Sequence, residues 1–182
     1  MIIIKRHHSG FNLVELMVVI AILGVLIAVA IPALQDWIRN ARVRSTTESI
    51  MAGFQIARNE ALRRNSTVRM TLNADTSWLV GCDPANDADA NGDGLEDCPS
   101  IIKSRSAKDG SVKIAATVTP NNSTSVLYSG FGRVVGGIEN PITSVDIPSV
   151  VDVGVTPLRI IVTGGSIKMC DPAMATGDPK AC

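Results

Sequence analysis

The chain contains almost no histidine, and this absence limits what it can do. Its two histidines, His7 and His8, both lie within the first ten of 182 residues. Ser-His-Asp and Cys-His catalysis, histidine general bases and histidine metal ligands all require an imidazole. From Ser9 to the C-terminus the chain therefore cannot support any of these chemistries.

Net charge and paired cysteine motifs are also lacking. Lys+Arg and Asp+Glu both number 17 over the whole chain, but residues 66–182 hold thirteen acidic against nine basic residues. An acidic region of this kind is a poor general surface for nucleic acid, because phosphate binding depends on basic patches. The four cysteines have no C-x-x-C spacing, which argues against a zinc site.

What the chain does have is one long apolar run. Leu16–Leu34 holds nineteen residues without a charge, interrupted only by Gly24 and Pro32. As a helix that rises about 1.5 Å per residue, this run would span roughly 28 Å, close to the ~30 Å hydrocarbon core of a bilayer. A basic segment at residues 5–8 precedes the run, and basic residues stay on the cytoplasmic side. We therefore expect everything after about Gln35 to face the other compartment.

A conventional secretory signal is the alternative interpretation of this run. Ala28-Val29-Ala30 has the small-x-small form of a signal-peptidase site, and cleavage there would release a soluble β-domain. Two features argue against it. The helical pattern continues through Pro32, and the acidic Glu15 stands at the edge of the apolar core.

Beyond the apolar run, the pattern predicts first a helix and then short strands. Ile50, Phe54, Ala57 and Ala61 recur at helical spacing, so we expect an amphipathic helix that ends at Asn65. After it, alternating residues and turn signals predict an antiparallel sheet or small sandwich rather than βαβ units. The expected strands are 68–72, 78–80, 101–103, 112–119, 125–128, 150–153, 158–162 and 167–170, with turns at 73–76 and 163–165.

The N-terminal residues resemble the processing site of type IV prepilins. Gly10-Phe11, the acid Glu15 and Pro32 all fall where that family has them. The resemblance implies that a prepilin peptidase cuts after Gly10 and methylates Phe11, the new N-terminal residue. It also implies that the helix containing Glu15 and Pro32 carries subunit assembly. In the family, the acid pairs with the N-terminal amine of a neighbouring subunit, and an ionised acid beside lipid needs such a partner.

A second resemblance extends through the rest of the chain. The run Ala57–Asn65 leading into Val68, then Trp78, Phe131-Gly132-Arg133 and the closing strand pair, is similar to the GspH/FimT group of pilins and pseudopilins. The group implies an α+β pilin fold, in which a long N-terminal helix packs against an antiparallel β-rich head. The implied domains are a leader at 1–10, a transmembrane and filament-core helix at 11–34, an amphipathic continuation at 35–65 and a periplasmic head at 66–182.

The same resemblance implies a non-enzymatic function that needs no cofactor. A FimU-like minor type IV pilin, which acts in pilus assembly initiation or in a tip complex, is the favoured interpretation. A GspH-like pseudopilin of type II secretion and a FimT-like DNA-uptake pilin are the alternatives. The expected partners are other pilins or pseudopilins, the prepilin peptidase and the inner-membrane assembly platform. The chain would cross the inner membrane once, with its head in the periplasm, and later reach the cell surface in the filament.

The four cysteines allow three pairings. An exported domain meets an oxidising compartment, where an even number of cysteines usually forms disulfides. We favour Cys82–Cys98 and Cys170–Cys182, because both pairs close loops that begin Cys-Asp-Pro-Ala and contain no expected strand. Each disulfide would stabilise the fold by about 3 kcal/mol by restricting the unfolded chain.

A calcium loop is weakly indicated between the first two cysteines. Asp87, Asp89, Asn91 and Asp93 place oxygen ligands at alternate positions, as calcium loops require. Neither possible register ends in the bidentate glutamate, since the twelfth position is Cys98 or Ser100. We therefore favour an acidic surface loop over a metal site.

DNA binding is not expected. Some FimT-type members take up DNA through a C-terminal Gly-Arg-x-Arg loop, and the corresponding residues 165–168 read Gly-Ser-Ile-Lys here. One of the two basic residues is absent, and the surrounding region is acidic. Arg133 and Lys168 are therefore the only candidates that the resemblance leaves, and nucleic acid is an unlikely partner.

Overall fold

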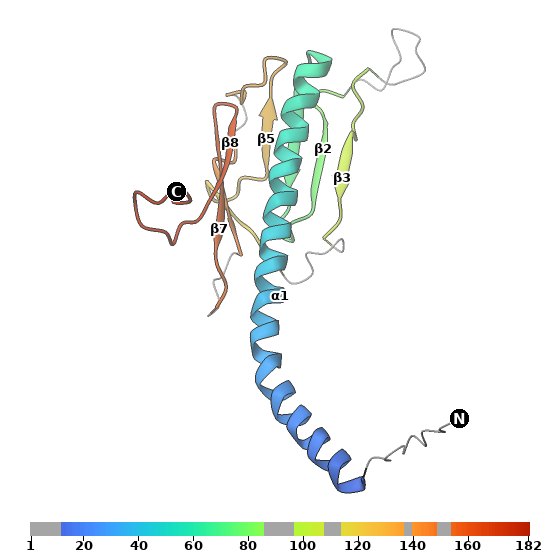
Figure 1. The fold of residues 1–182 in the computed structure, drawn as a ribbon. Coiled ribbons are helices and arrows are strands. Elements are labelled where there is room, and N and C mark those ends of the chain that lie inside the picture. The colour runs from blue at the N-terminus through green and yellow to red at the C-terminus, as the bar shows by residue number, and fades with distance from the viewer. Residues whose placement is uncertain (1–11, 86–96, 108–113, 137–139, 149–153) are drawn as a thin grey trace, which may run out of the picture. The chain divides into compact units, whose positions relative to one another are not determined.

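The computed structural model describes residues 12–85, 97–107, 114–136, 140–148 and 154–182. These residues form one long helix followed by eight short strands (Figure 1). The elements are α1 Leu13–Arg64, β1 Val68–Leu72, β2 Trp78–Cys82, β3 Lys103–Arg105, β4 Thr117–Thr119, β5 Ser125–Tyr128, β6 Ser144–Ile147, β7 Leu158–Thr163 and β8 Ser166–Cys170. The chain divides into two compact units, residues 1–38 and 39–182.

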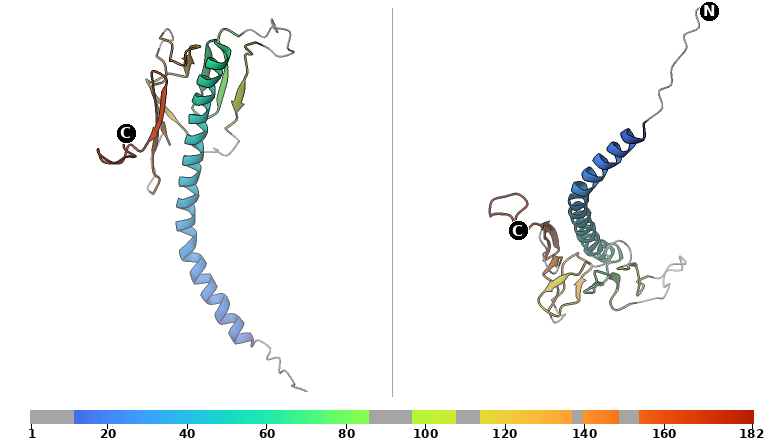
Figure 2. Two further views of the ribbon diagram at one scale, coloured as in Figure 1. Left: turned by 45° about the horizontal axis from the view of Figure 1, so that its top comes forward. Right: turned by 90° about the horizontal axis from the view of Figure 1, so that it is seen from below.

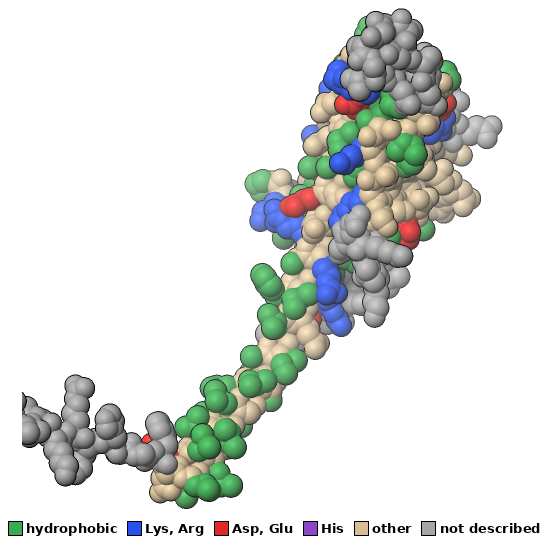
Figure 3. Space-filling view, turned by 90° about the vertical axis from the view of Figure 1, so that its right-hand side faces the viewer, with side chains coloured by type: hydrophobic (Ala, Val, Ile, Leu, Met, Phe, Trp, Pro, Cys, Tyr) green, Lys and Arg blue, Asp and Glu red, His purple; other side chains and the backbone are tan. Residues whose placement is uncertain are grey.

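The first unit consists, where it is described, of the first part of α1. Its large apolar side chains from Leu13 to Leu34 are between 43% and 71% exposed, and they point to all sides of the helix. Figure 3 shows them along the shaft as a series of hydrophobic side chains. A helix that is apolar all round is normally buried in protein or lipid. By its length and composition, this stretch is able to cross a membrane.

The second unit contains two four-stranded antiparallel sheets. Their strand orders are β3-β2-β1-β5 and β4-β6-β7-β8. The expected hairpin between β1 and β2 is present, with Leu72 opposite Trp78. Gly164 and Gly165 join β7 to β8, and both have the positive φ that two-residue hairpin turns require (61° and 123°).

The second half of α1 supplies one wall of the core. Figure 1 shows this half of the helix in front of the β3-β2-β1-β5 sheet, and Figure 2 shows the same packing from two further directions. The expected helix face is confirmed, because Ile50, Phe54, Ala57 and Ala61 are all completely buried. Burying a large apolar side chain of this kind contributes about 1.5–3 kcal/mol. The strands contribute the rest of the core, mainly Val68, Met70, Val80, Val126, Tyr128, Val145, Ile147, Ile160 and Val162.

Two asparagines define local features of α1: Asn65 at its C-terminal end, and Asn40, which binds a segment of the β-rich head. The helix ends at Arg64 because Asn65 adopts a left-handed backbone conformation (φ 50°), as C-terminal caps commonly do. Near the start of the second unit, Asn40 binds the segment that precedes β7. Its amide Nδ2 donates to Gly154 O, and its Oδ1 accepts from the backbone N–H of Thr156, both at 2.8 Å.

The expected α+β architecture, a long helix packed on antiparallel sheets, is confirmed, but three strands differ from expectation. The strand expected at 101–103 lies at Lys103–Arg105, and only Thr117–Thr119 of the segment expected at 112–119 is a strand among the residues described there. β6 was not expected at all. The strand expected at 150–153 lies outside the described residues.

Candidate assembly surfaces

The acid expected to direct assembly lies at the start of α1. Glu15 is in the first turn of the helix and is exposed. A carboxylate is favourable there, because the helix macrodipole places partial positive charge at its N-terminus. Pro32 lies inside α1, farther along the apolar stretch. Gly10 and Phe11 lie outside the described residues, so cleavage and methylation stay predictions.

Trp78 of β2 packs against Gly53 of α1 and so holds the second half of the helix to the sheet. A β-carbon placed on Gly53 would lie only 3.0 Å from Cδ2 of Trp78 and 3.1 Å from Cε of Met70. The Trp78 indole nitrogen Nε1 donates to Ser49 Oγ at 3.1 Å, one turn earlier on the helix. This contact was not predicted from the sequence. Its signal was a glycine inside a helical pattern, which often marks close packing.

An arginine network ties the end of α1 to the first disulfide loop. Arg64 Nε lies 2.9 Å from Glu60 Oε2, and Arg64 Nη1 donates to Asp97 O at 2.6 Å. Arg63 Nη2 lies 2.7 Å from the same Glu60 oxygen. The hydrogen bonds from Arg63 lower the pKa of the Glu60 carboxyl, partial burial opposes this effect, and Arg64 lowers the pKa further. Residues next to Cys98 are thereby fixed to the helix.

Both disulfides form as the sequence analysis favoured. Cys82 pairs with Cys98 and Cys170 with Cys182, with Cα–Cα distances of 5.5 and 5.0 Å. The first pair is buried and belongs to the core, whereas Cys182 is exposed. The candidate calcium ligands Asp87, Asp89, Asn91 and Asp93 lie outside the described residues. Across the residues that are described, no three or more His, Cys, Asp or Glu side chains are placed to share a metal ion.

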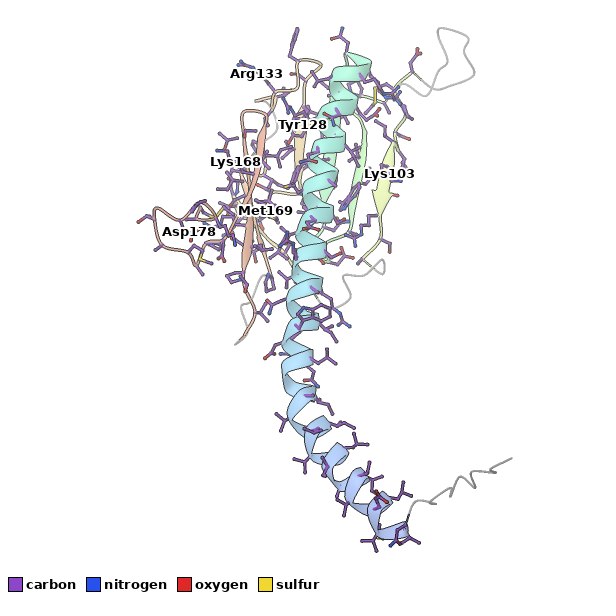
Figure 4. The ribbon with its side chains drawn as sticks, in the orientation of Figure 1. Lys103, Tyr128, Arg133, Lys168, Met169 and Asp178 are labelled. Carbon is purple, nitrogen blue, oxygen red and sulfur yellow. A yellow bond between two sulfur atoms is a disulfide. The ribbon has the colours of Figure 1, made fainter. Side chains whose placement is uncertain are left out.

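The C-terminal disulfide closes a compact exposed loop. The backbone N–H of Asp171 donates to Lys180 O at 2.7 Å, and the buried Asp171 carboxylate accepts from the Ala173 N–H at 2.8 Å. Asp178 accepts in the same way from the Lys180 N–H. Figure 4 shows this loop projecting beside β7 and β8. Its order therefore depends on a few local hydrogen bonds and on the disulfide.

The two basic residues weighed for DNA binding are on the surface. Arg133 follows β5 in a tight turn and Lys168 lies in β8, and both side chains are exposed (Figure 4). The structure brings the backbone of their segments together, since a β-carbon on Gly165 would lie 2.5 Å from Gly132 O.

Tyr128 places a polar hydroxyl group inside the apolar core. Tyr128 is completely buried, and its hydroxyl has no hydrogen-bond partner among the described residues. Burial raises the pKa of this phenol well above its usual value, while the charge of Arg58 acts in the opposite direction. The phenol therefore stays protonated at physiological pH, as a core side chain.

A comparison with known families identifies the protein. A family model described as type II transport protein GspH matches residues 46–178, which is most of the second unit. The chain belongs to the GspH family. A model of the prokaryotic N-terminal methylation motif also matches this GspH-family chain, at residues 5–31. The motif and the apolar first part of α1 together indicate a membrane-anchored pilin.

Individual relatives and one solved structure agree with this assignment. The GspH-family chain is 30% identical over 121 residues to a fimbrial protein of Pseudomonas aeruginosa, covering 66% of this chain and 75% of that protein. It is 62% identical over 36 residues to a fimbrial protein of Moraxella nonliquefaciens, covering 20% and 23% of the two chains. The crystal structure of the Pseudomonas aeruginosa type IV minor pilin FimU is similar with a TM-score of 0.50 at 14% identity, over 74% of this chain and 92% of that one. That likeness shows the fold, and the chain is a type IV pilin-like protein of the GspH/FimT group.

Proposed function

We propose that this chain is a minor type IV pilin, a non-enzymatic subunit that acts when a filament starts or at its tip. One observation carries the proposal, namely that a GspH-family β-rich unit and an exposed apolar helix with a methylation motif occur in one chain. The likeness of its fold to the minor pilin FimU supports the same role. The partners are other minor and major pilins.

Processing comes first in this proposal. The prepilin peptidase removes residues 1–10 and methylates Phe11, so that residues 11–34 anchor the chain in the inner membrane as a single pass. The head, residues 66–182, then faces the periplasm until the inner-membrane assembly platform moves the subunit into the filament. The extent of the matched methylation motif, which includes Gly10, Phe11 and Glu15, supports this order.

Glu15 has a specific task in this assembly. An ionised acid costs about 2.5–3.5 kcal/mol at the centre of a bilayer and less near its surface. The N-terminal amine of the next subunit, Phe11 in another copy or its equivalent in another pilin, offsets this cost. The pairing is stronger than in water because the surrounding medium has a low dielectric constant.

Substitution of Glu15 tests the proposal. Glu15→Val removes the cost of a carboxylate beside lipid, so its level in the inner membrane should equal or slightly exceed that of the wild type. Its share in sheared filaments should fall about tenfold or more, because a charge-assisted hydrogen bond is lost. Glu15→Gln keeps the shape of the side chain and loses the charge, so it should fail in the same way. Wild-type amounts of Glu15→Val in filaments would show that Glu15 is only an interfacial acid.

A pseudopilin of type II secretion is the second candidate, because the matched family model carries that description. Deletion of the gene separates the two roles. If the chain is a minor pilin, its loss should leave the cell with fewer surface pili and normal export of secreted enzymes. If it is a pseudopilin, its loss should reduce the export of secreted enzymes and leave the number of surface pili normal.

A further inference from the structure

The turn after β5 exposes an aromatic side chain beside a leucine of α1. Phe131 is 84% exposed, more than any other large apolar side chain in the described part of the chain. Leu62, which is 45% exposed, lies against the next residue of the turn, since a β-carbon on Gly132 would be 3.2 Å from three carbons of the Leu62 side chain. Two of the few exposed large apolar side chains of the second unit thus come together at one place.

This turn is rigid. The Gly132 N–H donates to Ser129 O at 2.7 Å, and the Ser129 N–H donates to Arg133 O at 2.8 Å. Gly132 has a left-handed φ of 71°, and its carbonyl accepts from Arg58 Nε of α1 at 3.2 Å. Phe131 is therefore held in solvent by a fixed turn on the helix, and not by a loose loop.

Two arginines border the apolar pair. Arg58 reaches the turn from α1, and Arg133 ends it. Both side chains are exposed, and neither forms a salt bridge with an acidic residue among those that the structure describes. The nearby acid on α1, Glu60, is already bound by Arg63 and Arg64. Figure 4 shows Arg133 on the outside of the ribbon, at the same end of the unit as the C-terminal end of α1.

We propose that this cluster, Leu62, Phe131, Arg58 and Arg133, docks another pilin subunit of the same filament. The facing surface of that subunit offers an apolar recess bordered by Asp or Glu side chains. Aromatic and arginine side chains are enriched at the cores of protein interfaces, and arginine is enriched among the few residues that supply most of the binding energy. Holding such side chains in place before binding lowers the cost of association. The positive charge of the two arginines selects an acidic partner, and a basic surface is repelled. The inference rests on the proposed function, because it takes the partner to be a pilin.

Photocrosslinking in assembled filaments identifies the partner. A benzophenone-bearing phenylalanine analogue replaces Phe131 in the full chain, and intact filaments are irradiated. The expected product joins position 131 to another pilin, at a peptide that contains Asp or Glu. A product with lipid, with a protein that is not a pilin, or with a peptide whose charges are basic overturns the inference.

Matched substitutions measure the contribution of the cluster. Phe131→Ser and Arg133→Glu should each lower the share of the chain in filaments by about tenfold or more, as at interface hot spots, with unchanged amounts in the membrane. Ile101→Ser and Lys103→Glu change an exposed apolar residue and an exposed basic residue elsewhere on the second unit, and should leave this share as it is. Equal incorporation of all four variants beside the wild type overturns the docking surface and leaves the pilin proposal intact. A wild-type chain that never enters filaments overturns both.

Discussion

At the scale of single residues, Gly53 decides how closely the helix approaches the sheet. Glycine in a helix interior costs about 0.5–1 kcal/mol relative to alanine. In this chain the missing β-carbon leaves room for the Trp78 indole, which also binds Ser49 on the preceding turn. The cost of the glycine is therefore offset by the burial of a large aromatic side chain.

Replacing this glycine should separate the helix from the sheet. Gly53→Val adds three carbons where one would already lie 3.0 Å from the Trp78 ring. Overpacking of this kind costs about 1–3 kcal/mol, so the melting temperature of the full chain in detergent should fall by about 2–12 °C. Gln55→Val is the control, because it places the same side chain on an exposed position of the same helix. If both variants melt at the temperature of the wild type, the Trp78 contact does not hold the helix to the sheet.

At the scale of elements, the two disulfides close loops of similar length but differ in what surrounds them. They span sequence separations of 16 and 12 residues, so the unfolded chain is restricted to a similar degree by each. Cys82 and Cys98 are in the core, Arg64 holds Asp97 just before Cys98, and β3 pairs with β2 just after it. Residues 172–180 of the C-terminal loop are exposed, and the hydrogen bonds described for the loop join residues within it.

Removal of the two disulfides should therefore have unequal effects. Replacing Cys82 and Cys98 by serine should cost about 3 kcal/mol and lower the melting temperature by about 6–12 °C. Replacing Cys170 and Cys182 should change it much less, because the freed C-terminal loop gains disorder in the folded state as well as in the unfolded state. Thermal unfolding of both double variants under identical conditions checks this. Equal losses in the two would mean that the C-terminal loop is part of the cooperative fold.

The elements also show how far the sequence predicts this structure. The helix face at Ile50, Phe54, Ala57 and Ala61 was predictable because a single strong periodicity specifies it. β6 was missed although Val145 and Ile147 alternate with two polar residues, because the strand is only four residues long and lies between two prolines. Its place in the sheet depends on the partner strand, where Arg159 Nε lies 2.6 Å from Asp146 Oδ1. Contacts such as Arg58 with Gly132 join residues 74 positions apart, and no local pattern indicates them.

At the scale of the whole molecule, the two units need different surroundings. The second unit buries its own core between α1 and two sheets. The first unit exposes its apolar side chains, and its stable states are those in which lipid or other helices cover them. A pilin meets both conditions in turn, first in the membrane and then inside a filament. We propose that this chain passes from the membrane into a filament after losing its leader.

The intact mass and N-terminal sequence of the chain recovered from sheared filaments test this claim most directly. The expected species begins at N-methylated Phe11, keeps both disulfides and is present in the filament fraction. Such a result requires cleavage after Gly10, retention of the apolar helix and incorporation, all in the same molecule. A chain that begins at Ile31, or one that is abundant in the membrane but absent from filaments, would contradict the account.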